Sequence, residues 1–460
     1  MSGREQEIGH GGTVERKLKE FNGDIDIFVP ETQEQEYLKH HGVEIHHLEN
    51  GITIVGATRR VEDNAYASIE ESFASGAYHE PTGKRGINHL LEHLIAIKPF
   101  YIATGNDANF NAFTSNESLV IVTEGRANPN VRDYGVWPAL SVVNSQLVRP
   151  LSISQADLQN EINVVIGEMY YRNADHNSPV RTMINEVVFS KTNPMNYKTI
   201  GTEEELRSIT LDDIKTCFES IVVPKGLDIG VFAEGSPEIT SSLMNDIESE
   251  LKNMPRQDKR PMIVDEDLFG ELNPDFKMGE IYVRDTGLRN DNIVINYMWV
   301  IPSTPFSVND YATGKFFDVA NQKMFRFFRE SGIGYACDSI NMEIGRRRLV
   351  GFQMNIAKRE EPKDFAKNLY PAIKDRVFGT FSSDDIAQIN KIAHKRLEAI
   401  PVTTLDRYND VRYGLKRYNR AIDSDKLPEI HKMITPQHLE QAREQFTSVE
   451  PAIVVVGDLS

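Results

Sequence analysis

Residues 86–96 have the sequence GINHLLEHLIA, and this stretch is the strongest indication of both fold and chemistry in the chain. On a helix, His89 and His93 are four residues apart and lie on one face, where two imidazoles can bind one metal ion. Glu92 projects to the same side, and its carboxylate can take a proton from metal-bound water. The order His-x-x-Glu-His inverts the commoner His-Glu-x-x-His and keeps the ligand spacing. We predict a site for one zinc ion per chain, with Glu92 as the base. A surface helix with two solvated histidines is the alternative.

A catalytic zinc ion usually has three protein ligands and one open position. The two histidines of this helix therefore need a third ligand from elsewhere in the chain. Ser154 and Asp157 have the spacing of a helix cap, and apolar residues then recur at helical spacing. On this expected helix, Glu161 and Glu168 lie on one face, two turns apart. We predict that Glu168 is the third ligand and that Glu161 orients a histidine.

The amino-acid composition is typical of a globular protein, and the net charge argues against some classes of binding partner. Among 460 residues, 51 are basic and 68 acidic, and the net charge of −17 argues against nucleic acid and anionic lipid as partners. No long apolar run provides a membrane span. The N-terminal residues lack the apolar core of a secretion signal, and there are only two cysteines. We therefore expect a cytoplasmic protein.

Two segments, beginning at Ile209 and Ile434, resemble each other. Each starts with a helix-capping threonine, Thr210 or Thr435, and continues through an expected helix into a buried apolar strand. We interpret them as the ends of two copies of one α+β unit. Near Gly314, where the second copy would match His89, the sequence has no metal pattern, so only the first copy is expected to bind zinc.

These observations predict four segments. An N-terminal extension, expected to be loosely held, covers 1–40, and the metal-binding α+β domain covers 41–255. A linker rich in charge and proline follows at 256–279, before a second, metal-free homologous domain at 280–460.

The metal helix and its surroundings resemble the pitrilysin/insulinase family of inverzincin zinc metallopeptidases, specifically the half-length branch that includes mitochondrial processing peptidase. The similarity covers most of residues 43–460. It includes FASGAYHEPTGKRGINHLLEH up to the metal helix, EINVVIGE at 161–168 and IGTEEELRSITLDDIKTCF from Ile200. The resemblance implies two homologous α+β domains, each an antiparallel-dominated sheet with helices packed on one face.

The segment GNDANFNAFTSNES, residues 105–118, resembles the edge strand of the family. This implies that Asn111, Ala112, Phe113 and Thr114 pair with the main chain of an extended substrate. In this family a longer, helix-containing connection usually precedes the strand, whereas here only residues 94–110 do so. We therefore expect unusual geometry beside it.

In the second half, FRESGIGYACDS resembles the family segment whose arginine and tyrosine hold the substrate and the tetrahedral intermediate. The matching residues are Arg329 and Tyr335. Because the family usually has one more residue between the two, Arg326 is the alternative arginine.

Taken with the resemblance, the sequence predicts a zinc-dependent endopeptidase acting on peptides or unfolded segments. Half-length relatives pair two chains, which implies either a homodimer or a heterodimer with a related chain, as in a processing peptidase. Two alternatives stay open: a non-catalytic structural or assembly subunit with the same fold, and a zinc hydrolase of non-peptide amides.

Overall fold

The computed structural model describes residues 26–458, except 175–176, 255–270, 288–291, 304–305, 345–346, 380, 383–386, 388–390 and 392–401. Most of the expected linker and residues 1–25 of the expected extension therefore lie outside the described residues.

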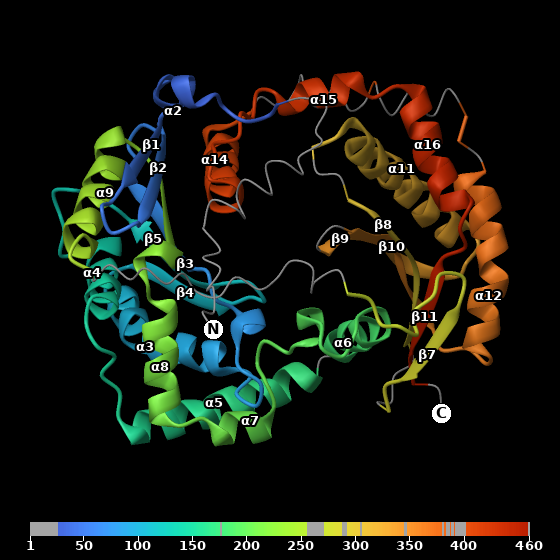
Figure 1. Cartoon of the computed structure of the whole chain (residues 1–460), viewed down its shortest axis with the longest axis horizontal. Coiled ribbons are helices and arrows are strands. Elements are labelled where there is room, and N and C mark those ends of the chain that lie inside the picture. Colours follow the sequence, from blue (N-terminus) through green and yellow to red (C-terminus); the bar gives the residue numbers. More distant parts are fainter. Residues whose placement is uncertain are drawn as a thin grey trace, which may run out of the picture.

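Two mainly antiparallel sheets, one in each half of the chain, organise the fold (Figure 1). The first sheet contains β1 (Val43–His47), β2 (Thr53–Arg59), β3 (Tyr66–Phe73), β4 (Ala108–Thr114), β5 (Leu119–Arg126) and β6 (Leu227–Glu234). The second contains β7 (Ile281–Asp285), β8 (Asn292–Pro302), β9 (Gly334–Ile344), β10 (Arg347–Ala357) and β11 (Ala452–Gly457). The predicted α+β class with two antiparallel-dominated sheets is confirmed.

The two sheets share the order of five strands, and the first has β1 as an additional edge strand. Their strand orders are β1-β2-β6-β3-β5-β4 and β7-β11-β8-β10-β9. β6 pairs parallel with β2 and antiparallel with β3, just as β11 pairs parallel with β7 and antiparallel with β8. A threonine-capped helix precedes each of these strands, α8 (Leu211–Ile221) before β6 and α16 (Pro436–Thr447) before β11. The two similar sequence segments thus occupy equivalent places, while the exact domain boundaries stay a prediction.

Helices cover one face of the first sheet and enclose its core. They are α3 (Ile87–Thr104), α4 (Val136–Leu147), α5 (Gln155–Ala174), α8 and α9 (Pro237–Leu251). Alternate strand residues point toward them, as the period of two in a strand requires. Examples are Ile54, Ile69, Ile121 and Val231, which share a core with Leu91, Leu140, Phe218 and Leu243.

The second sheet is covered in the same way by α11 (Val308–Glu330), α12 (Pro362–Ile373) and α16. Trp299 of β8 is fully buried at the centre of this core. Four phenylalanine rings surround its indole edge to face, namely Phe317, Phe352, Phe378 and Phe446. The shorter helices are α2 (Glu34–His41), α7 (Glu203–Ser208), α15 (Leu427–Met433) and the turns η1 (Glu31–Gln33), η2 (Ala77–His79), η3 (Pro194–Asn196), η4 (Pro224–Gly226) and η5 (Lys374–Phe378).

Each half also contributes one helix to the opposite face of the other half's sheet. α6 (Asn177–Val188) packs on β11, and α14 (Thr404–Tyr418) packs on β2 and β6. Arg412 of α14 is nearly buried and pairs with Glu70 at 3.0 Å and with Asp228 at 2.6 Å. The two halves are therefore joined by apolar packing and by buried charge.

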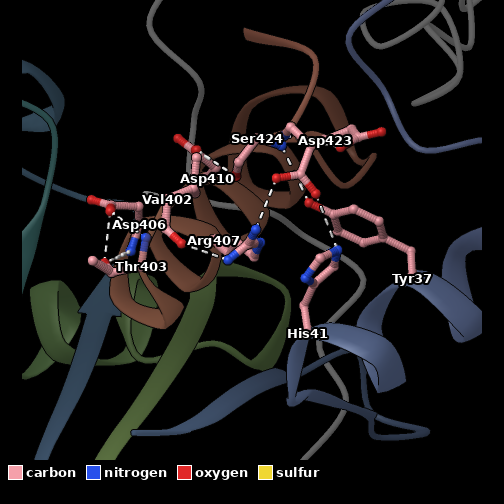
Figure 2. Close-up of polar contacts among 10 residues, drawn as sticks. Tyr37, His41, Val402, Thr403, Asp406, Arg407, Asp410, Asp423 and Ser424 are labelled. Carbon is pink, nitrogen blue, oxygen red and sulfur yellow. Dashed lines mark hydrogen bonds and ion pairs between the residues drawn. The ribbon is translucent and has the colours of Figure 1, made fainter. Parts of the chain in front are cut away.

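The described part of the expected extension is not loosely held. Ile27 and Phe28 are buried in the core of the second half, and Phe28 forms a β-bridge with Ile422. Figure 2 shows Tyr37 and His41 of α2 beside the start of α14, where the Tyr37 hydroxyl accepts a hydrogen bond from the Ser424 amide at 3.2 Å. The expectation was wrong for residues 26–40, because two apolar residues in a polar segment fill a core formed by distant parts of the chain.

Among the described residues, no helix has the length and apolar character needed to cross a membrane.

Candidate metal centre

The start of α3 is fixed by a buried carboxylate. Glu80 accepts hydrogen bonds from the amides of Gly86 at 2.8 Å and Asn88 at 2.9 Å, so both of its oxygens serve the helix N-terminus. Gly86 has a φ of 85°, and a Cβ there would lie 2.5 Å from the Ile200 carbonyl oxygen. This turn therefore requires glycine, and it sets the direction of the helix that carries the histidines.

After the histidines, α3 continues to Thr104, and β4 begins at Ala108. The short connection noted in the sequence is thus the remainder of α3 and one turn. α3, which carries the two histidines, leads directly into the edge strand without a further helix between them.

His89 and His93 lie on the same face of α3, with ring centroids 4.9 Å apart. Opposite them on α5, Glu168 Oε2 is 3.6 Å from His89 Nε2 and 3.4 Å from His93 Nε2. Two atoms bound to one tetrahedral zinc ion at about 2.1 Å lie about 3.4 Å apart. The Glu168 oxygen therefore lies at ligand spacing from each of the two imidazole nitrogens, while its role as a ligand stays a prediction.

The other ring nitrogens have contrasting surroundings. His93 Nδ1 is 3.2 Å from Glu161 Oε2, an arrangement that aims Nε2 toward Glu168. His89 Nδ1 is buried and has no hydrogen-bond partner among the described residues. Burial lowers the pKa of His89 to about 4, although Glu168 opposes this shift. The ring is therefore neutral near pH 7, as a metal ligand must be.

Glu92 is buried and belongs to the same cluster. The candidate ligand atoms of His89, Glu92 and His93 all lie within 4.8 Å of one another, and among the described residues these three form a group that could hold a metal ion. This group contains the predicted base Glu92 and not the predicted ligand Glu168, so the assignment of base and third ligand stays a prediction. Burial raises the pKa of Glu92, while a hydrogen bond from Thr114 lowers it. A carboxylate with a raised pKa is suited to taking and returning a proton near neutral pH.

Arg172, which was not among the predicted site residues, forms an ion pair with Glu168 Oε1 one turn further along α5. The spacing of four residues between an acidic and a basic residue was the available signal. The pair was overlooked because the same spacing is common on solvated helix faces.

Asn111–Thr114 lie on β4, at the end of the strand order of the first sheet. Within the described strands β4 pairs with β5 alone, so its other edge has main-chain groups available to an added strand. Thr114 donates to Glu92 at 2.7 Å, which places the end of this edge beside the metal cluster.

The predicted arginine and tyrosine lie in the other half of the molecule. Arg326 and Arg329 are exposed on α11, and Tyr335 follows the first residue of β9, with a side chain outside the described residues. Figure 1 shows α11 and β9 in the half built around the second sheet, away from α3 and α5. The structure does not bring these residues to the metal cluster within one chain, and their roles stay a prediction.

No protein-family model matches the sequence, and no curated protein matches it either. Solved structures do resemble the fold. A protease from Helicobacter pylori has a TM-score of 0.68 at 15% identity, over 90% of this chain and 99% of that one. A peptidase M16 inactive domain from Pseudomonas fluorescens has a TM-score of 0.68 at 12% identity, over 90% and 97%.

The periplasmic protease PqqL from Escherichia coli has a TM-score of 0.70 at 13% identity, over 91% of this chain. The match covers 48% of PqqL, so the chain spans about half the length of that protein. The chain therefore has the M16 peptidase fold, which confirms the resemblance at the level of the fold. Because one of these structures is an inactive domain, the fold alone does not show that a chain catalyses peptide hydrolysis.

Proposed function

We propose that this chain is a zinc-dependent endopeptidase that hydrolyses peptides or unfolded segments bound in extended form. The observation that carries the proposal is the convergence of His89, His93 and Glu168 from two helices at ligand spacing, with 3.4 and 3.6 Å between the glutamate oxygen and the two nitrogens. When bound, zinc supplies Lewis acidity and a more acidic water.

The side chains around this site have complementary roles. Glu92, held by Thr114, takes a proton from the attacking water and returns it to the departing amine as the C–N bond breaks. Glu161 holds His93 through Nδ1 and so keeps Nε2 directed at the metal position. A substrate strand added at β4 brings its carbonyl group toward Glu92.

A second chain completes the proposed site. α11 and β9 lie in the other half of the molecule from α3 (Figure 1), so we assign Arg329 or Arg326, and Tyr335, to the partner's active site. There, Tyr335 would donate a hydrogen bond to the developing oxyanion. The partner is a second copy or a related chain, as in a processing peptidase. We further propose the cytoplasm as the location, because the two cysteines are both free, as is usual in a reducing compartment.

The second candidate is a structural or assembly subunit that retains the fold without catalysis. The inactive M16 domain of Pseudomonas fluorescens supports this possibility, because it has the same fold. The presence of Glu92 at the metal cluster favours the enzyme, since a purely structural metal site requires no base.

The test is cleavage of a mixed peptide library by the purified chain. We expect cleavage that is lost with a chelator and restored by zinc. Glu92→Gln should retain zinc and lose cleavage, and Glu62→Gln, at an exposed position away from the site, should behave as the wild type. Cleavage that survives both the chelator and Glu92→Gln would refute the proposal. Zinc binding without cleavage, in the homodimer and with a related chain, would favour the structural subunit. Cleavage of non-peptide amides alone would favour the third alternative.

A further inference from the structure

We propose that Arg172 is a positioning residue that holds Glu168 so that a single carboxylate oxygen is offered to the metal. This inference rests on the proposed function, because it concerns the same metal site. It assigns a role to a residue outside the His-x-x-Glu-His pattern and outside the ligand set.

The two oxygens of Glu168 have different partners. Oε2 faces the Nε2 atoms of His89 and His93 at 3.6 and 3.4 Å, whereas Oε1 pairs with the Arg172 guanidinium. Arg172 lies one turn beyond Glu168 on α5, so the backbone of the helix fixes the position from which its side chain extends. The carboxylate is thereby held between a cation on one side and the two ring nitrogens on the other.

The number of Glu168 oxygens left free by Arg172 would affect the coordination number of a bound metal ion. A carboxylate can bind a metal ion through one oxygen or through both, and the second mode occupies an additional position. A catalytic zinc site needs three protein ligand atoms and an open position for water or substrate. Because Arg172 engages Oε1, Glu168 would offer Oε2 alone to a zinc ion, which would leave a position for water or substrate.

The same helix supplies both supporting contacts of the site. Glu161, Glu168 and Arg172 lie on one face of α5 at helical spacing. Glu161 orients His93 through a 3.2 Å contact, and Arg172 orients Glu168. Residues of this kind around a metal typically change its affinity about 10- to 100-fold when removed.

An ordinary surface ion pair is the competing explanation, since the Arg172 side chain is 49% exposed. Such a pair contributes little to stability and nothing to a metal site. The chain offers a matched control, because Arg207 makes the same four-residue pair with Glu203 on α7 at 2.8 Å and is 50% exposed. Comparison of the two arginines separates a positioning role from a generic helix pair.

The experiment measures zinc affinity of the full chain by competition with a chromophoric chelator, together with the visible spectrum of the cobalt(II) form and the melting temperature of the metal-free form. For Arg172→Met we expect zinc affinity about tenfold weaker than in the wild type. We also expect weaker cobalt absorption, because a second carboxylate oxygen raises the coordination number. Arg172→Lys should recover part of the affinity, and Arg207→Met should bind zinc as the wild type does.

Several results would overturn the inference. One is an Arg172→Met variant that binds zinc as tightly as the wild type or more tightly, with an unchanged cobalt spectrum. Another is an equal loss of affinity in Arg207→Met, which would indicate a general effect of helix pairs. If the wild type itself binds no zinc, the proposed function falls and this inference falls with it, so the two failures are distinguishable.

Discussion

The Thr114 hydroxyl donates a hydrogen bond to Glu92, with 2.7 Å between Thr114 Oγ1 and Glu92 Oε2. Thr114 ends the edge strand β4, and Glu92 lies between the two histidines on α3. One hydrogen bond therefore connects the strand proposed to bind substrate with the carboxylate proposed to move the proton. The adjacency follows from the direct passage of α3 into β4.

The first prediction concerns this contact. Thr114→Val removes the hydroxyl with little change in shape, and we expect kcat to fall about 10- to 100-fold, because a hydrogen bond to a charged group is worth about 1.5–3 kcal/mol. Thr114→Ser retains the donor and should preserve most of the activity. Steady-state kinetics of the three proteins provide the measurement. Equal activity of the valine and wild-type proteins would show that Thr114 does not position the base.

The second prediction separates ligand from base. Glu168→Gln should lose zinc during dialysis, because a neutral amide is a poorer ligand than a carboxylate. Glu92→Gln should keep one zinc per chain and lose about 10²–10⁴-fold in kcat, the usual contribution of a general base. Metal analysis of both variants, combined with kinetics, provides the test. Loss of zinc from Glu92→Gln with retention in Glu168→Gln would exchange the two assignments.

The local part of the site could be predicted from the sequence, because it depends on helical periodicity. His89, Glu92 and His93 share one helix, and Glu168 follows from a capped helix with a clear apolar stripe. The Thr114 contact could not be predicted, since it depends on how α3 joins the next strand. Arg172 has the four-residue spacing to Glu168 that predicts an ion pair on a helix. Many exposed helix pairs have the same spacing, so the sequence alone did not indicate a role at the site.

The arrangement of the two halves relative to each other was harder to predict from the sequence. The repeat indicated equivalent units, and the structure gives both sheets the same strand order except for β1, an additional edge strand of the first sheet. α6 and α14 each pack on the sheet of the other half. This packing depends on which sheet faces the helices of the same half leave uncovered, and no local sequence pattern predicts it. Likewise, Ile27 and Phe28 reveal their burial only when the core of the second half is present.

The third prediction concerns the ion pairs of Arg412, which connect α14 to the sheet of the first half. Arg412→Met leaves Asp228, which is 17% exposed, and Glu70, which is 39% exposed, without their cation, and we expect a loss of about 1.5–3 kcal/mol in the free energy of unfolding. Arg59→Met breaks an exposed pair with Glu234 on the same sheet and should change it by less than about 1 kcal/mol. Urea unfolding followed by circular dichroism compares the two. Similar small effects would mean that the buried pair does not hold the halves together.

The fourth prediction concerns Glu71, which is 2% exposed on β3. Burial, with a smaller contribution from the negative charge of Glu250, raises its pKa from 4.5 to about 8. The folded protein therefore keeps this proton at pH values where the unfolded chain has released it. The resulting stabilisation is fully present below pH 4.5 and is lost as the pH rises toward about 8, by up to about 1.4 kcal/mol per pH unit.

Glu71→Gln should remove this dependence, because an amide is neutral at every pH in the range and preserves the size of the side chain. The difference in unfolding free energy between variant and wild type should therefore grow in favour of the variant from pH 5 to pH 8. Urea titrations at these pH values measure the difference, with the exposed Glu62→Gln as the control, whose curve should run parallel to that of the wild type. A Glu71→Gln curve that also runs parallel would mean that Glu71 is ionised in the folded protein. In that case a cation or a donor near its buried Oε1, which has no hydrogen-bond partner among the described residues, would have to compensate the charge.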